Sequence, residues 1–215
     1  MIHAPAVPAP FGHAEAFNCA SHLVGAILAT AGLVPLVMIA ARGGDPWRII
    51  GVVVFGATLV SLYGASSAYH GLRGRLRPIF QRLDHAAIYL LIAGTWTPVA
   101  LVEMRDAWGL TLLGAVWALA AVGVGFVFRR EAPPRWLPVG LGLVMGWLGV
   151  FALGPLSRAL PMAGLVGIFV GGLLYTGGAV AYALDRRLAF GHGLFHVLVL
   201  GGSIAHYLVV LLYLA

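Results

Sequence analysis

The sequence predicts an all-α integral membrane protein: a bundle of seven transmembrane helices, with the N-terminus in the cytoplasm and the C-terminus outside. Hydrophobic residues make up 61% of the 215 residues and charged residues only 9%, and the mean hydropathy is +0.97. A water-soluble domain cannot hide that much apolar surface, whereas a lipid bilayer accommodates it. Two further observations support this fold class: seven apolar runs of helix length, and an uneven distribution of arginine.

Each of the seven apolar runs is close to the ~20 residues that a helix needs to cross a bilayer. We expect helices near residues 20–41, 48–70, 85–104, 107–128, 136–156, 161–184 and 191–214. They form one transmembrane domain over residues 15–215. Residues 1–14 lack a basic segment and contain three prolines, which predicts a flexible N-terminal arm and no signal peptide.

Two pairs of glycines at helical spacing lie in the fifth and sixth runs. Gly142 and Gly146 form one pair, and Gly167 and Gly171 form the other. Small residues four apart let neighbouring helices approach closely, so both pairs predict tight helix packing.

Arginine gives the orientation, because loops rich in Arg face the cytoplasm. The loops after the second, fourth and sixth runs, with their flanks, hold nine arginines, and the opposite loops hold four. The first set and the N-terminus are therefore expected inside. Since the net charge of +6 lies in short loops between apolar runs, we expect membrane lipids as partners and no nucleic acid.

Two histidines, His192 and His196, begin the last run and lie four residues apart, on one helix face. Ionisable groups inside a bilayer are costly, so such a pair suggests a functional site. The predicted topology brings His70, at the end of the second helix, and Asp84, at the start of the third, to the same side. His206 is expected about 15 Å deeper, outside this cluster.

Three neutral imidazoles and a water form the open coordination of a catalytic zinc site. We therefore expect His70, His192 and His196 to bind Zn²⁺. Asp84 is the expected carboxylate that orients the water or takes its proton, and Ser66, one turn before His70, is expected to donate a hydrogen bond into the site.

Each of these residues also has a structural interpretation. Asp84 could cap the third helix, and Ser66 could bond back to a carbonyl of its own helix. His22 and His85 are expected at the lipid interface, with a role as metal ligands left open. His206 is expected to form a hydrogen bond between helices.

Four segments resemble a known family. They are E-A-F-N-C-A-S-H-L-V-G (15–25), S-S-A-Y-H (66–70), L-D-H-A-A-I-Y-L-L-I-A-G-T-W-T-P (83–98) and H-G-L-F-H-V-L-V-L (192–200). Together they look like the hemolysin III branch of the progestin and adipoQ receptor family. The resemblance implies seven helices and a zinc site near the cytoplasmic face, held by His70, His192 and His196, with Asp84 near the metal-bound water and Ser66 within the motif.

The resemblance also suggests a function. Related receptors and alkaline ceramidases suggest zinc-dependent hydrolysis of a lipid amide or ester, such as ceramide. The alternative is a non-enzymatic protein of membrane homeostasis, sensing or cytolysis, in which zinc is structural. A proton-coupled transporter is a weaker third interpretation, because it would need acidic residues deeper in the bilayer. We expect a multi-pass protein of the bacterial inner membrane; the sequence leaves the substrate and the oligomeric state open.

Overall fold

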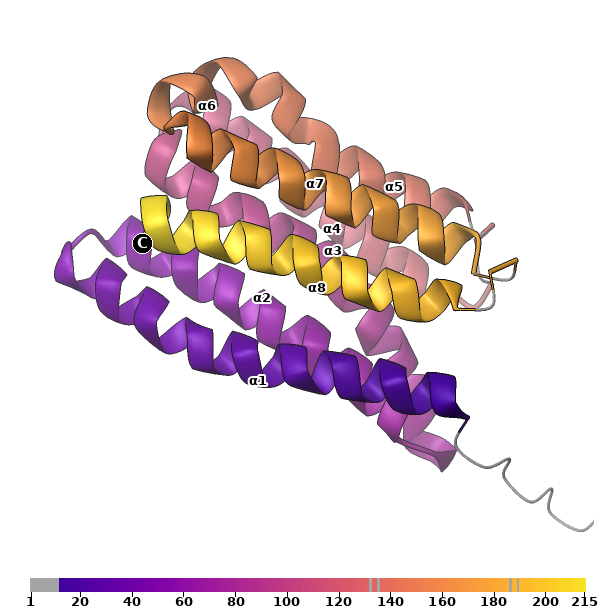
Figure 1. The fold of residues 1–215 in the computed structure, drawn as a ribbon. Coiled ribbons are helices and arrows are strands. Elements are labelled where there is room, and N and C mark those ends of the chain that lie inside the picture. The colour runs from indigo at the N-terminus through magenta and orange to yellow at the C-terminus, as the bar shows by residue number, and fades with distance from the viewer. Residues whose placement is uncertain (1–11, 132, 135, 186, 189) are drawn as a thin grey trace, which may run out of the picture.

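Helices account for nearly all of the chain in the computed structural model, which describes residues 12–131, 133–134, 136–185, 187–188 and 190–215. Seven spans are long and apolar enough to cross a membrane, as the sequence predicts. The first four are α1 (His13–Arg42), α2 (Pro46–Gly71), α3 (Arg77–Glu103) and α4 (Ala107–Phe128), with a short 3-10 turn η1 (Gly74–Leu76) before α3. Figure 1 shows them as long rods running alongside one another.

The last three spans are less regular. The fifth consists of α5 (Trp136–Trp147), a 3-10 segment η2 (Leu148–Ala152) and α6 (Leu153–Ala159). The sixth is α7 (Met162–Ala183), and the seventh is α8 (Gly191–Val209), which ends in a π-helical turn η3 (Val210–Leu214). The chain therefore has eight α-helices among its described residues but seven spans.

Two helices begin earlier than the hydropathy predicts. α1 starts at His13 and α3 at Arg77, whereas apolar runs alone placed them near residues 20 and 85. The additional N-terminal residues of both helices are partly polar. A hydropathy window leaves such residues out of a predicted span, although the helix continues through them. Pro78 in the first turn of α3 favours this earlier start, because its missing N–H is not needed there. Residues 1–11 of the expected arm lie outside the described residues.

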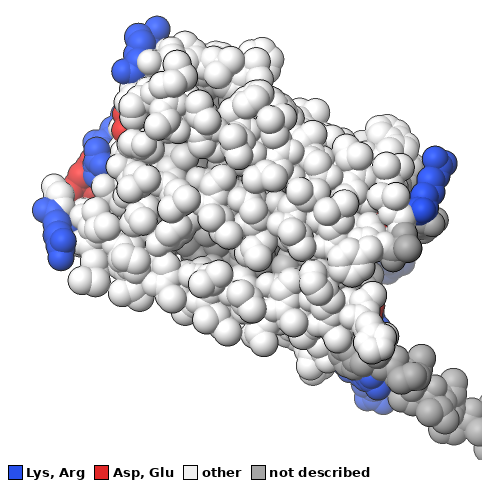
Figure 2. Space-filling view, viewed as in Figure 1, with Lys and Arg blue, Asp and Glu red and all other residues white. Residues whose placement is uncertain are grey.

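The outer surface has the character of a membrane protein. Large apolar side chains such as Ile27, Phe151 and Met162 are more than half exposed. Figure 2 shows charged side chains at the two ends of the bundle and none across the broad middle band of this face. Exposing an apolar band of this extent to water is unfavourable, so the band is the lipid-facing surface.

α3 forms the centre of the bundle and is the most buried of the seven spans. It packs chiefly on α2 and α4. At Gly51 the backbones of α2 and α3 approach closely, since a Cβ there would lie only 2.8 Å from Cα of Pro98. Such proximity fixes α2 against α3, and therefore positions the side chains at their ends.

The two glycine pairs behave differently. A Cβ at Gly167 or Gly171 would collide with α8, which confirms the predicted close packing for that pair. Gly142 and Gly146 instead border open space on α5: a Cβ at Gly146 meets no atom within 4 Å. The prediction of tight packing is therefore wrong for this pair, which borders a cavity.

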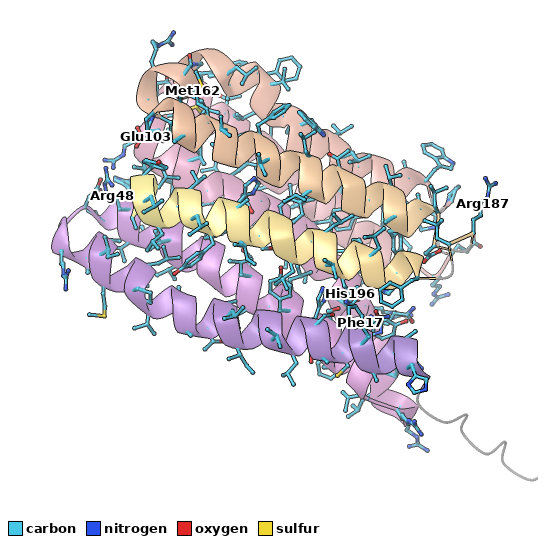
Figure 3. All side chains as sticks on the ribbon, viewed as in Figure 1. Phe17, Arg48, Glu103, Met162, Arg187 and His196 are labelled. Carbon is cyan, nitrogen blue, oxygen red and sulfur yellow. The ribbon has the colours of Figure 1, made fainter. Side chains whose placement is uncertain are left out.

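The end of the bundle opposite the histidines is fixed by a polar contact between two loops. Asp45 caps α2 by accepting a hydrogen bond from the backbone N–H of Trp47 at 3.0 Å, and it pairs with Arg105 after α3. The Arg105 guanidinium beside Asp45 holds the pKa of that carboxyl below its usual range. Figure 3 places Arg48 and Glu103 at this end, away from His196 and Arg187.

Candidate metal centre

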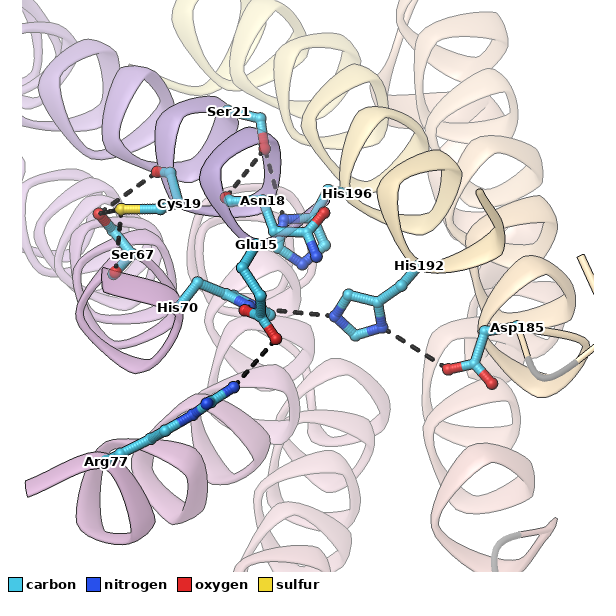
Figure 4. Close-up of polar contacts among 10 residues, drawn as sticks. All are labelled: Glu15, Asn18, Cys19, Ser21, Ser67, His70, Arg77, Asp185, His192 and His196. Atoms are coloured by element: carbon cyan, nitrogen blue, oxygen red, sulfur yellow. Dashed lines mark hydrogen bonds and ion pairs between the residues drawn. The ribbon is translucent and has the colours of Figure 1, made fainter. Parts of the chain in front are cut away.

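Three histidines from two distant segments meet at one end of the bundle. His70 lies in the last turn of α2, and His192 and His196 lie one turn apart at the start of α8. One nitrogen from each ring lies within 4.8 Å of the other two. The three are close enough to hold a metal ion, and Figure 4 shows His70 and His192 facing one another across the site.

The second nitrogen of each ring is directed to an outer partner. Nδ1 of His70 lies 2.6 Å from Oε2 of Glu15, and Nδ1 of His192 lies 3.7 Å from Oδ2 of Asp185. Nδ1 of His196 lies 3.4 Å from Oγ of Ser21. Outer partners of this kind orient metal-binding histidines, and they leave Nε2 of each ring as the available ligand.

Glu15 is itself held in place. Its other carboxylate oxygen, Oε1, accepts a hydrogen bond from Nη2 of Arg77 at 2.9 Å. A carboxylate cannot donate, so the short contact with His70 requires a proton on Nδ1 of that ring. The tautomer of His70 is thereby fixed, with its lone pair on Nε2.

The donor set fits a cation. Nε2 of His70 and Nε2 of His192 lie 3.4 Å apart, so the two nitrogens are close enough to bind the same ion. Two nitrogen ligands of a tetrahedral zinc ion, each about 2.05 Å from it, are separated by about 3.3 Å. The third ring, His196, must move inward to complete such a site.

Polar groups of α1 surround the triad. The His22 ring stacks on His196 with centroids 3.6 Å apart, and it is buried instead of interfacial, which corrects the sequence interpretation. Both ring nitrogens of His22 and Oδ1 of Asn18 are buried without a hydrogen-bond partner among the described residues. Buried polar atoms normally find partners, so these atoms are available to a water or a bound group at this site.

Asp84 and Ser66 lie beside each other on α3 and α2. Asp84 is in the second turn of α3, whose N-cap is Leu76, so the alternative that Asp84 caps this helix is wrong. Ser66 is fully buried, and its hydroxyl makes no hydrogen bond to a carbonyl of its own helix, which excludes that alternative. Its neighbour is the Asp84 carboxyl group.

Two further histidines, His85 and His206, lie outside the triad. His85 borders the same cavity as Asp84. Nε2 of His206 lies 3.0 Å from the carbonyl oxygen of Ile168 on α7, which confirms the predicted hydrogen bond between helices.

Sequence reasoning missed the outer partners Glu15, Asp185 and Ser21. A signal for Glu15 was present: Glu15, Asn18 and His22 follow one another at spacings of three and four, and so form a polar stripe on one face of an apolar helix. Asp185 and Ser21 carried no comparable pattern, because only the packing of α1, α7 and α8 brings them to the histidines.

A cavity of about 1090 Å³ adjoins this site. Its lining includes Asp84, together with His22 and Asp185, which contact His196 and His192, and it continues along α3, α5 and α7 to the opposite end of the bundle. Pockets for drug-sized ligands measure about 300–1,000 Å³, so this one is large enough for a lipid chain.

Comparison with known proteins gives consistent results over nearly the whole chain. The sequence profile of the family described as "Haemolysin-III related" matches residues 12–207. The chain is 38% identical to "Hemolysin-3 homolog" of Bacillus subtilis (strain 168) over 202 residues, which is 93% of each chain. It is 36% identical to "Hemolysin-3" of Bacillus cereus over 202 residues, covering 93% of this chain and 91% of the relative.

A more distant relative is the human "Monocyte to macrophage differentiation factor", which is 24% identical over 211 residues, 95% of this chain and 86% of the relative. With the seven spans, the histidine triad and these matches together, the chain is a multi-pass membrane protein that belongs to the haemolysin-III related family.

Proposed function

We propose that this protein is a zinc-dependent hydrolase that cleaves a lipid amide or ester, with ceramide-like lipids as the first candidates. One observation carries the proposal: three convergent histidine nitrogens lie about one helical turn from Ser66, whose neighbour Asp84 is a carboxylate that lines a lipid-sized cavity. His70, His192 and His196 would hold the ion.

A zinc ion bound by three imidazoles would lower the pKa of a bound water to about 7 and so supply a nucleophile at neutral pH. In our proposal Asp84 accepts the proton of the attacking water and later delivers it to the leaving group. The Ser66 hydroxyl, which lies beside the Asp84 carboxyl group, donates a hydrogen bond to the oxyanion that develops on the carbonyl oxygen. Glu15 keeps Nδ1 of His70 protonated and its ring oriented.

The lipid partner enters from the bilayer and not from water, since the cavity runs within the membrane-spanning part of the bundle. The uneven distribution of arginine supports a cytoplasmic location for the metal centre and the N-terminus. By the same proposal the protein resides in the bacterial inner membrane, in keeping with its Bacillus relatives.

The proposal is tested by Asp84→Asn, which preserves size and loses the base. We expect zinc content to stay unchanged, because three histidines still hold the ion, while turnover falls by about 10²-fold or more. Turnover is measured on purified protein with a panel of ceramides and ester lipids. The matched control is Asp106→Asn at the opposite end, where the side chain caps α4 by accepting from the backbone N–H of Gly109 at 2.8 Å. Asn caps helices as well as Asp does, so this control should be silent.

A second candidate function is non-enzymatic. The triad joins α2 to α8, so a bound ion would also cross-link two spans that are distant in sequence. The names of the Bacillus relatives suggest cytolysis, which needs no base. This candidate predicts that Asp84→Asn leaves both lysis of red cells and zinc content unchanged. Turnover that survives Asp84→Asn would remove Asp84 from the mechanism.

A further inference from the structure

The cavity beside the metal centre is long and narrow rather than round. On α3 its lining residues run from Pro78 to Val99, which is about 30 Å of helix at 1.5 Å per residue. That length matches the thickness of the hydrocarbon core of a bilayer. On the α5 wall, Gly142 and Gly146 contribute no side chain, which widens the cavity at these two positions.

Three arginines line the end of the cavity nearest the triad: Arg82 from α3, and Arg129 and Arg130 from the end of α4. The helices α3 and α4 pack antiparallel, and Gly123 of α4 lies against the ring of Tyr89 on α3. Arg82 lies one to two turns before Tyr89, and Arg129 and Arg130 lie one to two turns after Gly123, so the three arginines are at one level of the bundle. All three are exposed, and none makes a hydrogen bond or ion pair with another described residue.

Two other arginines are paired, Arg77 with Glu15 and Arg105 with Asp45. The remaining described arginines do not line the cavity, so it is their place in its lining that distinguishes these three. Two carboxylates also border the cavity: Asp185 lies near His192, and Asp84 lies beside Ser66. Three arginines without an ion pair to another described residue therefore lie at the mouth of an apolar channel, which is the pattern that suits an amphiphile with an anionic head.

We propose that this cavity binds a lipid with an anionic phosphate headgroup, which Arg82, Arg129 and Arg130 hold at the mouth while a fatty chain extends along α3 and α5. Arginine suits this role because its planar guanidinium binds phosphate oxygens in pairs. Asp84 follows Arg82 by two residues, about 3 Å along the helix axis. The amide or ester bonds next to the phosphate of such a lipid would lie at that depth.

The assignment of the substrate class rests on the proposed hydrolase function, but the binding does not. We therefore test binding directly on the full-length protein in neutral detergent. The probes are dioleoyl phosphatidylglycerol and dioleoyl phosphatidylcholine, which share their chains and differ in headgroup charge. Native mass spectrometry over a lipid titration gives the Kd of each.

The test variant is Arg129→Gln/Arg130→Gln, and the matched control is Arg75→Gln/Arg187→Gln. The control removes the same charge at the same end of the bundle, from residues that do not line the cavity. Each arginine near a lipid phosphate contributes about fivefold in affinity, so the test variant should weaken phosphatidylglycerol binding roughly 25-fold and leave phosphatidylcholine unaffected. The control should change either Kd less than threefold.

Two further variants locate the site and separate it from the catalytic proposal. Gly146→Phe would fill the cavity from a position where a Cβ meets no neighbour, and it should abolish the preference for phosphatidylglycerol. His192→Ala removes a metal ligand and should leave the preference intact, so binding can stand even if hydrolysis fails. Equal affinity for the two lipids, equal loss in both double variants, or full binding in Gly146→Phe would each overturn the proposal.

Discussion

Glu15 offers the sharpest test of how the metal centre is organised. The perturbation is Glu15→Gln, which keeps the size of the side chain and can still accept a hydrogen bond from Nδ1 of His70. It removes the charge from a contact of 2.6 Å and weakens the 2.9 Å contact with Arg77. Because the histidine would be a metal ligand, the effect should appear as reduced affinity for zinc, and not as a failure to fold.

The size of the effect follows from the contact. A hydrogen bond to a charged partner contributes about 1.5–3 kcal/mol, and a neutral one about 0.5–1.5 kcal/mol. The Glu15 side chain is 38% exposed, so solvent screening favours the smaller difference, about 1 kcal/mol. That difference is about fivefold in affinity. Glu15→Ala removes the partner entirely and should cost about tenfold, the lower end of the effect of outer partners on metal affinity.

Zinc affinity is measured on detergent-solubilised protein by competition with a chromogenic chelator. Glu131→Gln is the matched control, since it removes the same charge from the loop between α4 and α5 at the same end of the bundle. We expect its zinc affinity to equal that of the unmodified protein. If Glu15→Gln and Glu15→Ala both bind zinc within twofold of this control, Glu15 does not orient His70 and the reasoning is refuted.

Three further predictions concern the metal and the topology. His192→Ala should lose most of the bound zinc while His206→Ala keeps it, as measured by elemental analysis of purified protein; full occupancy in His192→Ala would contradict the ligand assignment. Stripping the metal with a chelator should lower the melting temperature, because an ion bound only by the folded state stabilises it, and zinc should restore it. In a Cys19→Ala background, Arg75→Cys and Gly44→Cys should label from opposite sides of the membrane with an impermeant reagent, and labelling from the same side would rule out the orientation.

The sequence by itself determined the seven spans. Apolar runs of about 20 residues have few alternatives in a bilayer, because a helix satisfies every backbone hydrogen bond within its own segment. Hydropathy failed only at helix ends and at local irregularities. It started α3 near residue 85 instead of at Arg77, and it gave no sign of the 3-10 segment Leu148–Ala152 within the fifth span. These features depend on polar residues and neighbours that a hydropathy window averages away.

The histidine triad was also predictable, since topology alone brings the end of the second span and the start of the seventh to one face. What surrounds the triad was not. Glu15, Asp185 and Ser21 reach the outer nitrogens of the three rings only because α1 and the segment before α8 pack at particular rotations. The rotation of each helix about its own axis is set by side-chain contacts between spans. When every face of a helix is apolar, the periodicity of its sequence does not predict that rotation.

The cavity shows most clearly the difference between what the sequence predicts and what the packing decides. Gly142–Gly146 and Gly167–Gly171 are identical patterns in the sequence, yet one pair borders open space and the other is packed against α8. Spacing determines that a helix has a smooth face, but only the arrangement of the neighbouring helices decides whether that face is filled by protein or left for a ligand. The sequence therefore determined the membrane fold and which three histidines meet, and the tertiary structure decided which groups surround them and where the cavity lies.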